Sequence, residues 1–248
     1  MVTFATVLSP TVAKLTPNYY DRICPKALPI IRSVVKQAIY REPRIGASLL
    51  RLHFHDCFVN LGGNQYWYQV LLGRRDARNA SWDAANANLP PPFFNFSQLI
   101  TNFNSHGLNL KDLVVLSGGH TIGFAKCTSF RDRIFNDTNI DTTFAADLQK
   151  TCPRIGGDDN LAPFDSTPKK VDTAYYKSLL YKKGLLHSDQ ELFKGDGSQS
   201  DNLVLKYSKD SYAFAKDFGV SMIKMGNLKP LTGKKGEIRC NCRKVNYY

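Results

Sequence analysis

Residues 45–60 read IGASLLRLHFHDCFVN, and this stretch decides which fold the chain can adopt. Its apolar residues recur at the three- and four-residue spacing of an amphipathic helix. On such a helix Arg51 and His55 lie one above the other on the same face, whereas residues two apart do not share a face. On a strand, His53 and His55 would share a face instead and could bind a metal. The helical spacing favours the Arg51–His55 pair, although such a pair taken alone is usually structural.

Helical patterning continues through most of the chain. Residues 27–41 place their apolar side chains on one stripe of a helix. Asn109 and Asp112 have the spacing of a capping box, which opens a helix that ends at the glycine pair 118–119. Further helices are predicted at 143–151, 173–182, 201–207 and 212–225, loops at 89–94, 154–160 and 194–202, and short strands at 66–72 and near 120–124. The sequence therefore predicts one large, mostly α domain.

The composition is that of an ordinary globular protein. Of the 248 residues, 43% are hydrophobic and 22% are charged, and no apolar run reaches the roughly 18 residues of a membrane helix. Lys and Arg outnumber Asp and Glu by 33 to 21, which gives a formal net charge of +12. Such a surface attracts polyanions, but the basic residues are scattered and lack regular aromatic interleaving. A solvated basic surface is therefore preferred to a nucleic-acid site, and no membrane association is expected.

Several short features favour the secretory pathway. The six cysteines suggest disulfides, which form in oxidising compartments. Residues 1–13 resemble the remnant of a signal peptide, although they lack a basic start. Asn79, Asn95 and Asn136 each begin an N-x-S/T triplet that fits glycosylation, but triplets this short often arise by chance.

A second marker is SGGHTIGFAKC, residues 117–127. A histidine directly after a glycine pair has little crowding around it, so a large planar group could approach the ring of His120. The alternative is a solvated histidine at a helix C-cap, and for this motif alone that is the better interpretation. His106 and His187 have no comparable context and are interpreted as ordinary surface or loop residues.

Taken together, the motifs resemble those of the secreted plant haem peroxidases, the horseradish type. The segments that carry the resemblance keep the family's order from about Leu15 to Asn246: LTPNYYDRICP, IGASLLRLHFHDCFVN, YWYQVLLGRRDA, NLPPPFFNFSQL, LSGGHTIGFAKC, HSDQELF and FGVSMIKMGNLKPLTGKKGEIRCNCRKVN. The resemblance implies a mostly α, haem-peroxidase-type fold with a few short strands. Its single domain would span residues 14–248, with distal-side helices in 14–60 and the proximal side and C-terminal part in 61–248.

The resemblance also implies a role for individual residues. His120 matches the axial ligand of the haem b iron, and Asp189 matches the carboxylate that holds the other ring nitrogen. On the opposite face of the haem, His55 would transfer the proton of hydrogen peroxide and Arg51 would stabilise the developing charge. The haem pocket and the exposed edge where phenols react are expected to involve Phe54, Pro90, Phe93 and Phe164.

The family also binds two calcium ions. The resemblance assigns the proximal site the oxygen donors of Thr121, Asp165, Thr167, Lys170 and Asp172. One residue separates the first aspartate and threonine, where the family usually has two, so this site could be rearranged. The distal site keeps only Asp56 and the Val59 carbonyl and is doubtful. Cys127–Cys152 is the implied disulfide with both halves present.

The resemblance breaks directly after Asn60. There the family continues with further helices and a second cysteine-bearing stretch, whereas this chain passes straight to LGGNQYWYQ. The loss removes the asparagine that accepts a hydrogen bond from the distal histidine, part of the wall over the haem, and the disulfide partners of Cys24, Cys57 and Cys242. Each native disulfide contributes about 2–5 kcal/mol against a net stability of about 5–15 kcal/mol. The chain is therefore expected to have an open distal pocket and weak or no activity.

The leading hypothesis is a monomeric haem enzyme that uses hydrogen peroxide to oxidise phenolic donors by one-electron steps. It would be secreted to the cell wall or vacuole, where its basic surface suits acidic polysaccharide. The alternative is a truncated, non-catalytic member of the family that binds haem or polyanions. A zinc enzyme built on HFHD, residues 53–56, is a third and much weaker hypothesis.

Overall fold

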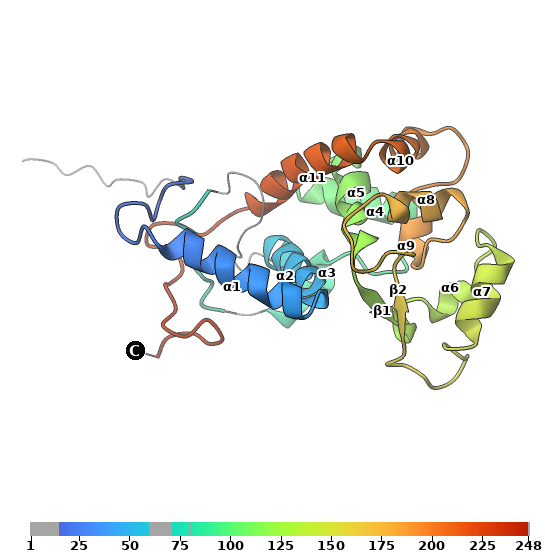
Figure 1. Ribbon diagram of the computed structural model, residues 1–248, viewed down its shortest axis with the longest axis horizontal. Helices are drawn as coiled ribbons and strands as arrows, with labels where there is room; N and C mark the ends of the chain where they lie inside the picture. Colours follow the sequence, from blue (N-terminus) through green and yellow to red (C-terminus); the bar gives the residue numbers. More distant parts are fainter. Residues whose placement is uncertain (1–14, 60–70, 80, 248) are drawn as a thin grey trace, which may run out of the picture.

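Helices dominate the computed structural model, which describes residues 15–59, 71–79 and 81–247 (Figure 1). The predicted mostly α fold is confirmed. The remnant leader at 1–13 and the junction after Asn60 lie outside the described residues. The helices are α1 Ala27–Arg41, α2 Arg44–Val59, α3 Trp82–Asn88, α4 Phe96–Ser105, α5 Leu110–Ser117, α6 Arg131–Asn136, α7 Thr142–Gln149, α8 Ala174–Leu180, α9 His187–Gln190, α10 Gln199–Lys209 and α11 Ser211–Gly226, with the 3₁₀ turns η1 Gly118–Thr121 and η2 Cys127–Ser129.

Capping side chains decide where several helices begin. Asn109 and Asp112 form the predicted capping box of α5. The helix α10 begins inside the predicted loop 194–202, because the Ser198 hydroxyl accepts a hydrogen bond from the backbone of Asp201. The helices α3, α4, α6 and α9 were not predicted; α3, α6 and α9 are too brief to show a clear apolar period, whereas the apolar face of α4 was overlooked.

The described strands are few and short. β1, Phe124–Lys126, pairs with β2, Leu161–Pro163, in an antiparallel sheet. The predicted strand near 120–124 was wrong in its start, because η1 continues to Thr121 before the chain extends. Of the predicted strand 66–72, only the last two residues are described, and there Leu72 forms a single bridge with Thr16.

The main hydrophobic core lies between the end of α2 and helices α4, α5, α8, α10 and α11. Its largest fully buried side chains include Phe58, Leu113, Tyr175, Tyr176 and Tyr207. A buried polar contact holds α5 against α11: the Asp112 carboxylate accepts hydrogen bonds from Ser221, at 2.7 Å, and from Lys224. Asp112 therefore caps one helix and ties it to another.

A second, smaller core lies at the end of the molecule opposite α1 (Figure 1). It is built around the Cys127–Cys152 disulfide by β1, β2, α6 and α7. The other four cysteines carry free thiols, of which Cys57 is buried while Cys24, Cys240 and Cys242 are exposed.

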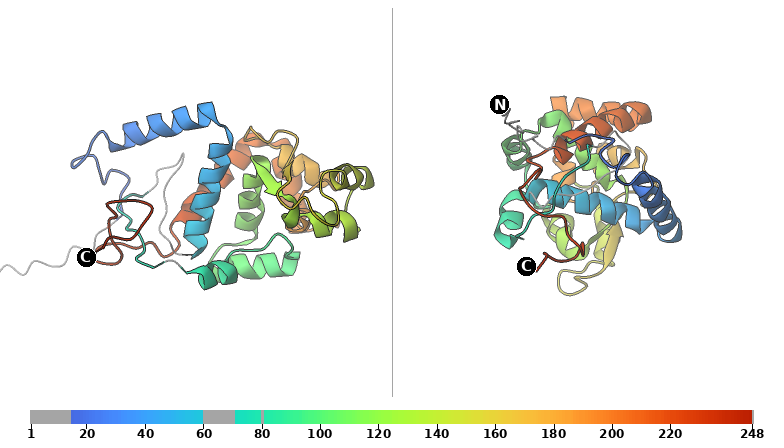
Figure 2. Two further views of the ribbon diagram at one scale, coloured as in Figure 1. Left: turned by 90° about the horizontal axis from the view of Figure 1, so that it is seen from below. Right: turned by 90° about the vertical axis from the view of Figure 1, so that its left-hand side faces the viewer.

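The helix α1 has an apolar stripe but no buried residue. Ile39 approaches α2 at Gly46, whereas the side chains of Ile30, Ile31 and Val34 are 56%, 46% and 60% exposed. Figure 2 shows α1 at the edge of the molecule, where it meets α2 near its C-terminal end. Its apolar stripe is therefore largely in contact with water. Within the described part of the chain, no helix combines the length and apolarity needed to cross a membrane.

The exposure of α1 gives a direct test of this arrangement. We expect Ile31→Ser to change the free energy of unfolding by less than about 0.5 kcal/mol, because the side chain remains in water and the two residues have similar helix propensities. Leu113→Ala, which truncates a fully buried side chain, should cost about 2–5 kcal/mol. Urea denaturation measures both values. A loss above about 1 kcal/mol for Ile31→Ser would mean that this face of α1 is covered in solution.

Candidate active site

His120 lies in the 3₁₀ turn η1, directly after α5. The glycine pair before it allows close packing of the turn, while the His120 side chain itself remains 38% exposed. A Cβ atom on Gly118 would collide with the Tyr176 hydroxyl and the Phe214 ring, and one on Gly119 would lie 3.2 Å from Leu50. The missing side chains therefore let η1 approach α8, α11 and α2 at once.

A buried carboxylate fixes the imidazole of His120. Its Nδ1 lies 2.8 Å from Oδ1 of Asp189, a side chain that is 2% exposed. The other Asp189 oxygen accepts the backbone N–H of Leu186 at 3.0 Å. Because an ionised carboxylate can only accept, Nδ1 is the nitrogen that donates its proton, and in the neutral ring the lone pair is therefore on Nε2. His120 is thus held in the tautomer that can bind a metal through Nε2.

Tyr175 is a member of this site that the sequence analysis missed. Its hydroxyl donates to Asp189 Oδ1 at 3.0 Å. Complete burial, together with the negative charge of Asp189, raises the pKa of Tyr175 well above its ordinary value, so the phenol stays protonated and keeps donating. No sequence signal distinguishes it, because Tyr175 occupies an ordinary core position of α8.

Phe164 stacks on the ring of His120. The two ring centroids are 4.2 Å apart and the ring planes are nearly parallel, at 1°. Phe164 directly follows β2, so the small sheet places this aromatic side chain against η1. The stacking and the Asp189 contact together restrict how the imidazole can turn.

The turn that carries His120 packs on the first half of α2. A Cβ atom on Gly123 would lie 3.0 Å from Ala47, and one on Gly46 would lie 3.5 Å from Ile122. Further along the same helix come Arg51 and His55. At 1.5 Å per residue, His55 lies about 7 Å along the helix axis from Leu50, which faces η1.

Arg51 and His55 contact each other directly, as their spacing on a helix allows. Arg51 Nε donates to His55 Nε2 at 3.3 Å. Burial and the nearby Arg51 charge lower the pKa of His55, so the ring is neutral at pH 7. Since Nε2 accepts this hydrogen bond, Nδ1 carries the proton. Arg51 therefore selects the His55 tautomer, although the asparagine that accepts a hydrogen bond from this histidine in the family is absent.

The four residues expected to line the haem pocket and its edge differ in their surroundings. Phe54 packs on Phe58, with ring centroids 4.6 Å apart, and its ring edge faces His55. Pro90 is half-buried just after α3, while Phe93 is 67% exposed. Phe54 thus lies beside the Arg51–His55 pair and Phe164 beside His120, whereas Phe93 extends into solvent.

The residues assigned to the proximal calcium site converge despite the shortened spacing. Thr121 Oγ1 donates to Asp165 Oδ2 at 3.0 Å, and Thr167 Oγ1 donates to Asp172 Oδ1 at 3.1 Å. Burial raises the pKa of Asp165, and the negative charge of Asp172 raises it further. Lys170 closes a turn on Thr167 through its backbone N–H. Two carboxylates and two hydroxyls therefore gather at one point, a set of hard oxygen donors.

The remainder of the distal calcium site is less complete. Asp56 lies on α2 three residues before Val59, where the helix ends. Burial, together with the charge of Asp76 and against that of Arg239, raises the pKa of Asp56 to about 6. In the described ranges, no three His, Cys, Asp or Glu side chains gather in a way that could hold a metal ion.

His53 points away from His55, as the helical spacing predicted, and is buried. Its Nε2 lies 3.7 Å from the Cys57 thiol. Burial, followed by the charge of Arg74, lowers the pKa of His53 to about 4. Burial likewise raises the pKa of Cys57 to about 12, so the orphaned thiol stays protonated and chemically inert at neutral pH.

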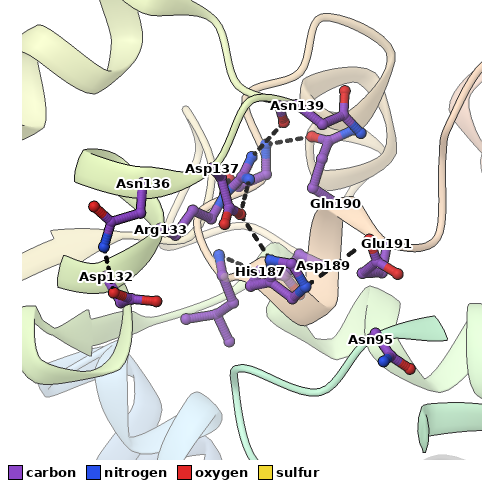
Figure 3. Close-up of polar contacts among 12 residues, drawn as sticks. Asn95, Asp132, Arg133, Asn136, Asp137, Asn139, His187, Asp189, Gln190 and Glu191 are labelled. Carbon is purple, nitrogen blue, oxygen red and sulfur yellow. Dashed lines mark hydrogen bonds and ion pairs between the residues drawn. The ribbon is translucent and has the colours of Figure 1, made fainter. Parts of the chain in front are cut away.

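The other two histidines are half-buried, His106 in a turn and His187 at the start of a helix, and each has a specific partner that the sequence did not reveal. His106 caps the end of α4 and contacts the Asn102 carbonyl through Nδ1 at 2.8 Å. His187 begins α9, and its Nδ1 lies 2.7 Å from Asp137 Oδ2 (Figure 3). Sequence reasoning missed this pair because the two residues are 50 positions apart.

Comparisons with known proteins identify relatives along nearly the whole chain. A family model described as Peroxidase matches residues 31–65 and 59–210. Peroxidase RIP1 of Medicago truncatula is 56% identical over 310 aligned positions, covering 99% of this chain and 95% of the relative. Peroxidase 2 of Oryza sativa subsp. indica is 43% identical, with coverages of 98% and 96%. Peroxidase 15 of Arabidopsis thaliana is 39% identical, with coverages of 94% and 89%.

The same comparisons locate a gap in the chain. The alignment with the Medicago relative has 310 positions and the chain has 248 residues, so at least 62 positions have no counterpart here. The family model matches in two pieces that meet at residues 59–65. The missing segment therefore belongs directly after α2, where the sequence resemblance breaks.

His53 gives the site a measurable pH dependence. Its native pKa of about 4 lies below the unfolded value of about 6.5, so on acidification the unfolded chain takes up a proton first. The stability present above pH 6.5 should therefore fall by about 3 kcal/mol as the pH drops to 4. His53→Gln should lack this component, as judged by urea denaturation at several pH values. His106→Gln serves as the control and should keep it. If His53→Gln loses stability as steeply as the unsubstituted chain, His53 is not buried in its neutral form.

Proposed function

The chain belongs to the plant peroxidase family, and on this basis we propose that His120 binds the iron of haem b while Arg51 and His55 act on hydrogen peroxide at its other face. The observation that carries the proposal is the hydrogen bond between His120 and the buried Asp189. An imidazole held in this way directs Nε2 toward a ligand. A carboxylate on Nδ1 also makes the imidazole a stronger electron donor to a metal.

The chemistry of the available side chains fits haem. The imidazole of His120 would supply a nitrogen donor to the haem iron, and Phe164 restrains its ring by stacking. On α2, Phe54 supplies an apolar ring beside the cationic Arg51 and the neutral His55. When bound, haem supplies the iron and the conjugated ring that pass oxidising equivalents from peroxide to a phenolic donor.

The two residues on α2 have complementary roles in this proposal. His55 would accept the proton from one oxygen of hydrogen peroxide and return it to the other, which makes that second oxygen the better leaving group when haem supplies the electrons that break the O–O bond. Arg51 stabilises the negative charge that develops as the O–O bond breaks. In the observed geometry, however, Arg51 occupies the lone pair on His55 Nε2. Arg51 must therefore turn toward the peroxide before His55 can act as a base.

We further propose that this chain is an impaired peroxidase. At least 62 positions are missing from the sequence directly after α2, the helix that bears His55. The missing segment provides no hydrogen-bond acceptor for His55 Nδ1. The ring is held instead by the hydrogen bond from Arg51 to its Nε2. General acid–base catalysis contributes about 10²–10⁴-fold to a rate, which sets the scale of the expected deficit. The extreme case is a member of the family that binds haem or polyanions without catalysis.

The proposed calcium site is the proximal group of Thr121, Asp165, Thr167 and Asp172, with the Lys170 carbonyl as a further donor. A divalent cation there would neutralise the two carboxylates that now share hydrogen bonds with the threonine hydroxyls. The site is adjacent to the proposed haem ligand, because Thr121 directly follows His120. Calcium would then brace η1. The distal remnant, Asp56 and Val59, has too few donors for a comparable site.

The setting of the protein follows from its family and its surface. Plant peroxidases act on hydrogen peroxide and phenolic donors, and the exposed Phe93 beside Pro90 offers an aromatic contact for a phenol. The Cys127–Cys152 disulfide fits an oxidising compartment. A net charge of +12 suits an acidic polysaccharide matrix. We therefore propose a secreted, monomeric, single-domain protein in the cell wall or vacuole.

Haem uptake and turnover test the proposal separately. Adding haem to the purified chain should produce a Soret absorption band that His120→Ala abolishes and the control His106→Gln retains. Turnover of guaiacol with peroxide should be about 10²–10⁴-fold lower than in a chain carrying the missing segment of the Medicago relative after Asn60. In that restored chain, His55→Leu should lower turnover again.

Each outcome has a distinct meaning. A chain that takes up no haem, or takes it up equally well without His120, contradicts the assignment of the axial ligand. A chain whose turnover equals that of its restored counterpart contradicts the proposed impairment while leaving the haem site intact.

Calcium binding should appear as a shift in thermal unfolding. A ligand that binds only the folded state at 100 times its Kd stabilises by about 2.7 kcal/mol, so excess calcium should raise the melting temperature relative to EDTA. Asp172→Asn should remove most of the shift, because it deletes one of the two carboxylate charges. Asp147→Asn is the matched control, since Asp147 pairs with Lys150 on the surface. An equal calcium shift in both variants would rule out the proximal group.

A further inference from the structure

The helix α9, which carries Asp189, is a single turn of four residues. One helical turn is not stable by itself, because nucleation orders several residues for very few hydrogen bonds. Its orientation must therefore come from contacts with neighbouring elements. This matters for the site, since any rotation of the turn displaces the carboxylate that holds His120.

Three groups of contacts hold α9 in place. Gln190 bonds to the Gly184 backbone and to the carbonyl groups of Leu179 and Phe193. The segment before α4 contributes two backbone contacts, from Ser188 to Pro92 and from Phe96 to Glu191. The third contact runs from His187 to Asp137, the residue that caps the C-terminal end of α6, and Asp137 in turn pairs with the buried Arg133.

The His187 contact ends in a rigid anchor. Asp137 Oδ2 accepts from His187 Nδ1 and from Arg133 Nη1, both at 2.7 Å. Arg133 is 2% exposed, and its remaining N–H groups bond to the carbonyls of Gly184 and Asn139. Figure 3 shows this chain running from α6 to the start of α9. The planar guanidinium of Arg133 has three hydrogen-bond partners, which hold it in one orientation. It therefore holds the Asp137 carboxylate in place, and Asp137 in turn holds the His187 ring.

His187 and Asp189 face different sides of the same turn. Two residues at 3.6 per turn are separated by about 200°, so one side chain can reach outward to α6 while the other reaches inward to His120. The other charged groups near His187 are Glu191, at 3.9 Å, and Lys194, which pairs with Glu191. The Asp137 contact is the shorter, and its geometry is set from outside α9.

We propose that His187, anchored by Asp137 and Arg133, is a positioning residue that sets the place of the Asp189 carboxylate against His120. The inference deepens the proposed haem site and rests on it for its catalytic meaning. The proposed position of Asp189 depends on side chains of this protein and not on bound haem. The N–H of His187 and the Asp137 carboxylate at the end of α6 thereby govern how firmly Asp189 holds the Nδ1–H group of His120.

The test uses the full-length, haem-free chain and three variants. His187→Leu removes the donor, His187→Asn restores an N–H near the position of Nδ1, and His106→Leu is a matched control on α4. The first readout is amide hydrogen exchange at Leu186, whose N–H is bonded to Asp189 Oδ2. The second is the ¹⁵N resonance of His120 Nδ1, which reports on the tautomer and its hydrogen bond.

His187→Leu should speed Leu186 exchange by about 10-fold or more, the scale for losing a hydrogen bond to a charged group. The same variant should shift the His120 Nδ1 resonance. Both effects should be reversed in His187→Asn and absent in His106→Leu, while exchange in α5 and α11 stays unchanged. If His187→Leu does not fold, Asp137→Asn, which keeps the side-chain volume, takes its place with the same readouts.

The proposal is overturned if neither readout moves, or if exchange rises equally in α5 and α11, which would show a general loss of stability only. It is also overturned if His187→Asn behaves like His187→Leu. These results do not depend on haem. A chain that fails to bind haem would therefore contradict the proposed function and leave the positioning role standing.

Discussion

The arrangement of the site depends on the hydrogen bond between His120 and the buried carboxylate of Asp189. An ionised group almost entirely removed from water must have its oxygens satisfied by donors, or the fold loses several kcal/mol. Here the donors come from three elements: His120 in η1, Tyr175 in α8 and the Leu186 backbone before α9. These elements can meet only because Gly118 leaves room for the Tyr176 ring. The buried charge of Asp189 thus requires η1, α8 and the start of α9 to pack together.

Local features of the sequence were sufficient to predict α1, α2 and the start of α5, because periodic apolar residues and the Asn109–Asp112 capping box act within a few residues. Motif resemblance brought His120 and Asp189 together as a pair. Contacts such as Asp137–His187 could not be predicted in this way, since 50 residues separate the partners and neither lies on a long periodic helix. The start of β1 was missed for a similar reason, because tertiary packing extends η1 to Thr121.

The two faces of the proposed haem site differ in how well they are supported. Around His120, each important side chain has partners from several elements, including Phe164 and Tyr175. Around His55, the support comes from α2 itself, through Arg51 and Phe54. In the proposed function, this difference separates cofactor binding from peroxide cleavage, two properties that normally go together. Binding of the cofactor relies on the well-supported face, whereas cleavage of peroxide relies on the weakly supported one.

The apolar stripe on α1 makes ionic strength a controlling variable for this protein. Ile30, Ile31 and Val34 favour contact between copies of the chain, whereas a charge of +12 on each copy drives them apart. The Debye length falls from about 30 Å at 0.01 M salt to about 3 Å at 1 M, so added salt removes the repulsion and leaves the attraction. We therefore expect colloidal stability to be greatest in dilute buffer, with the exposed stripe of α1 as the surface where added salt first allows contact between copies.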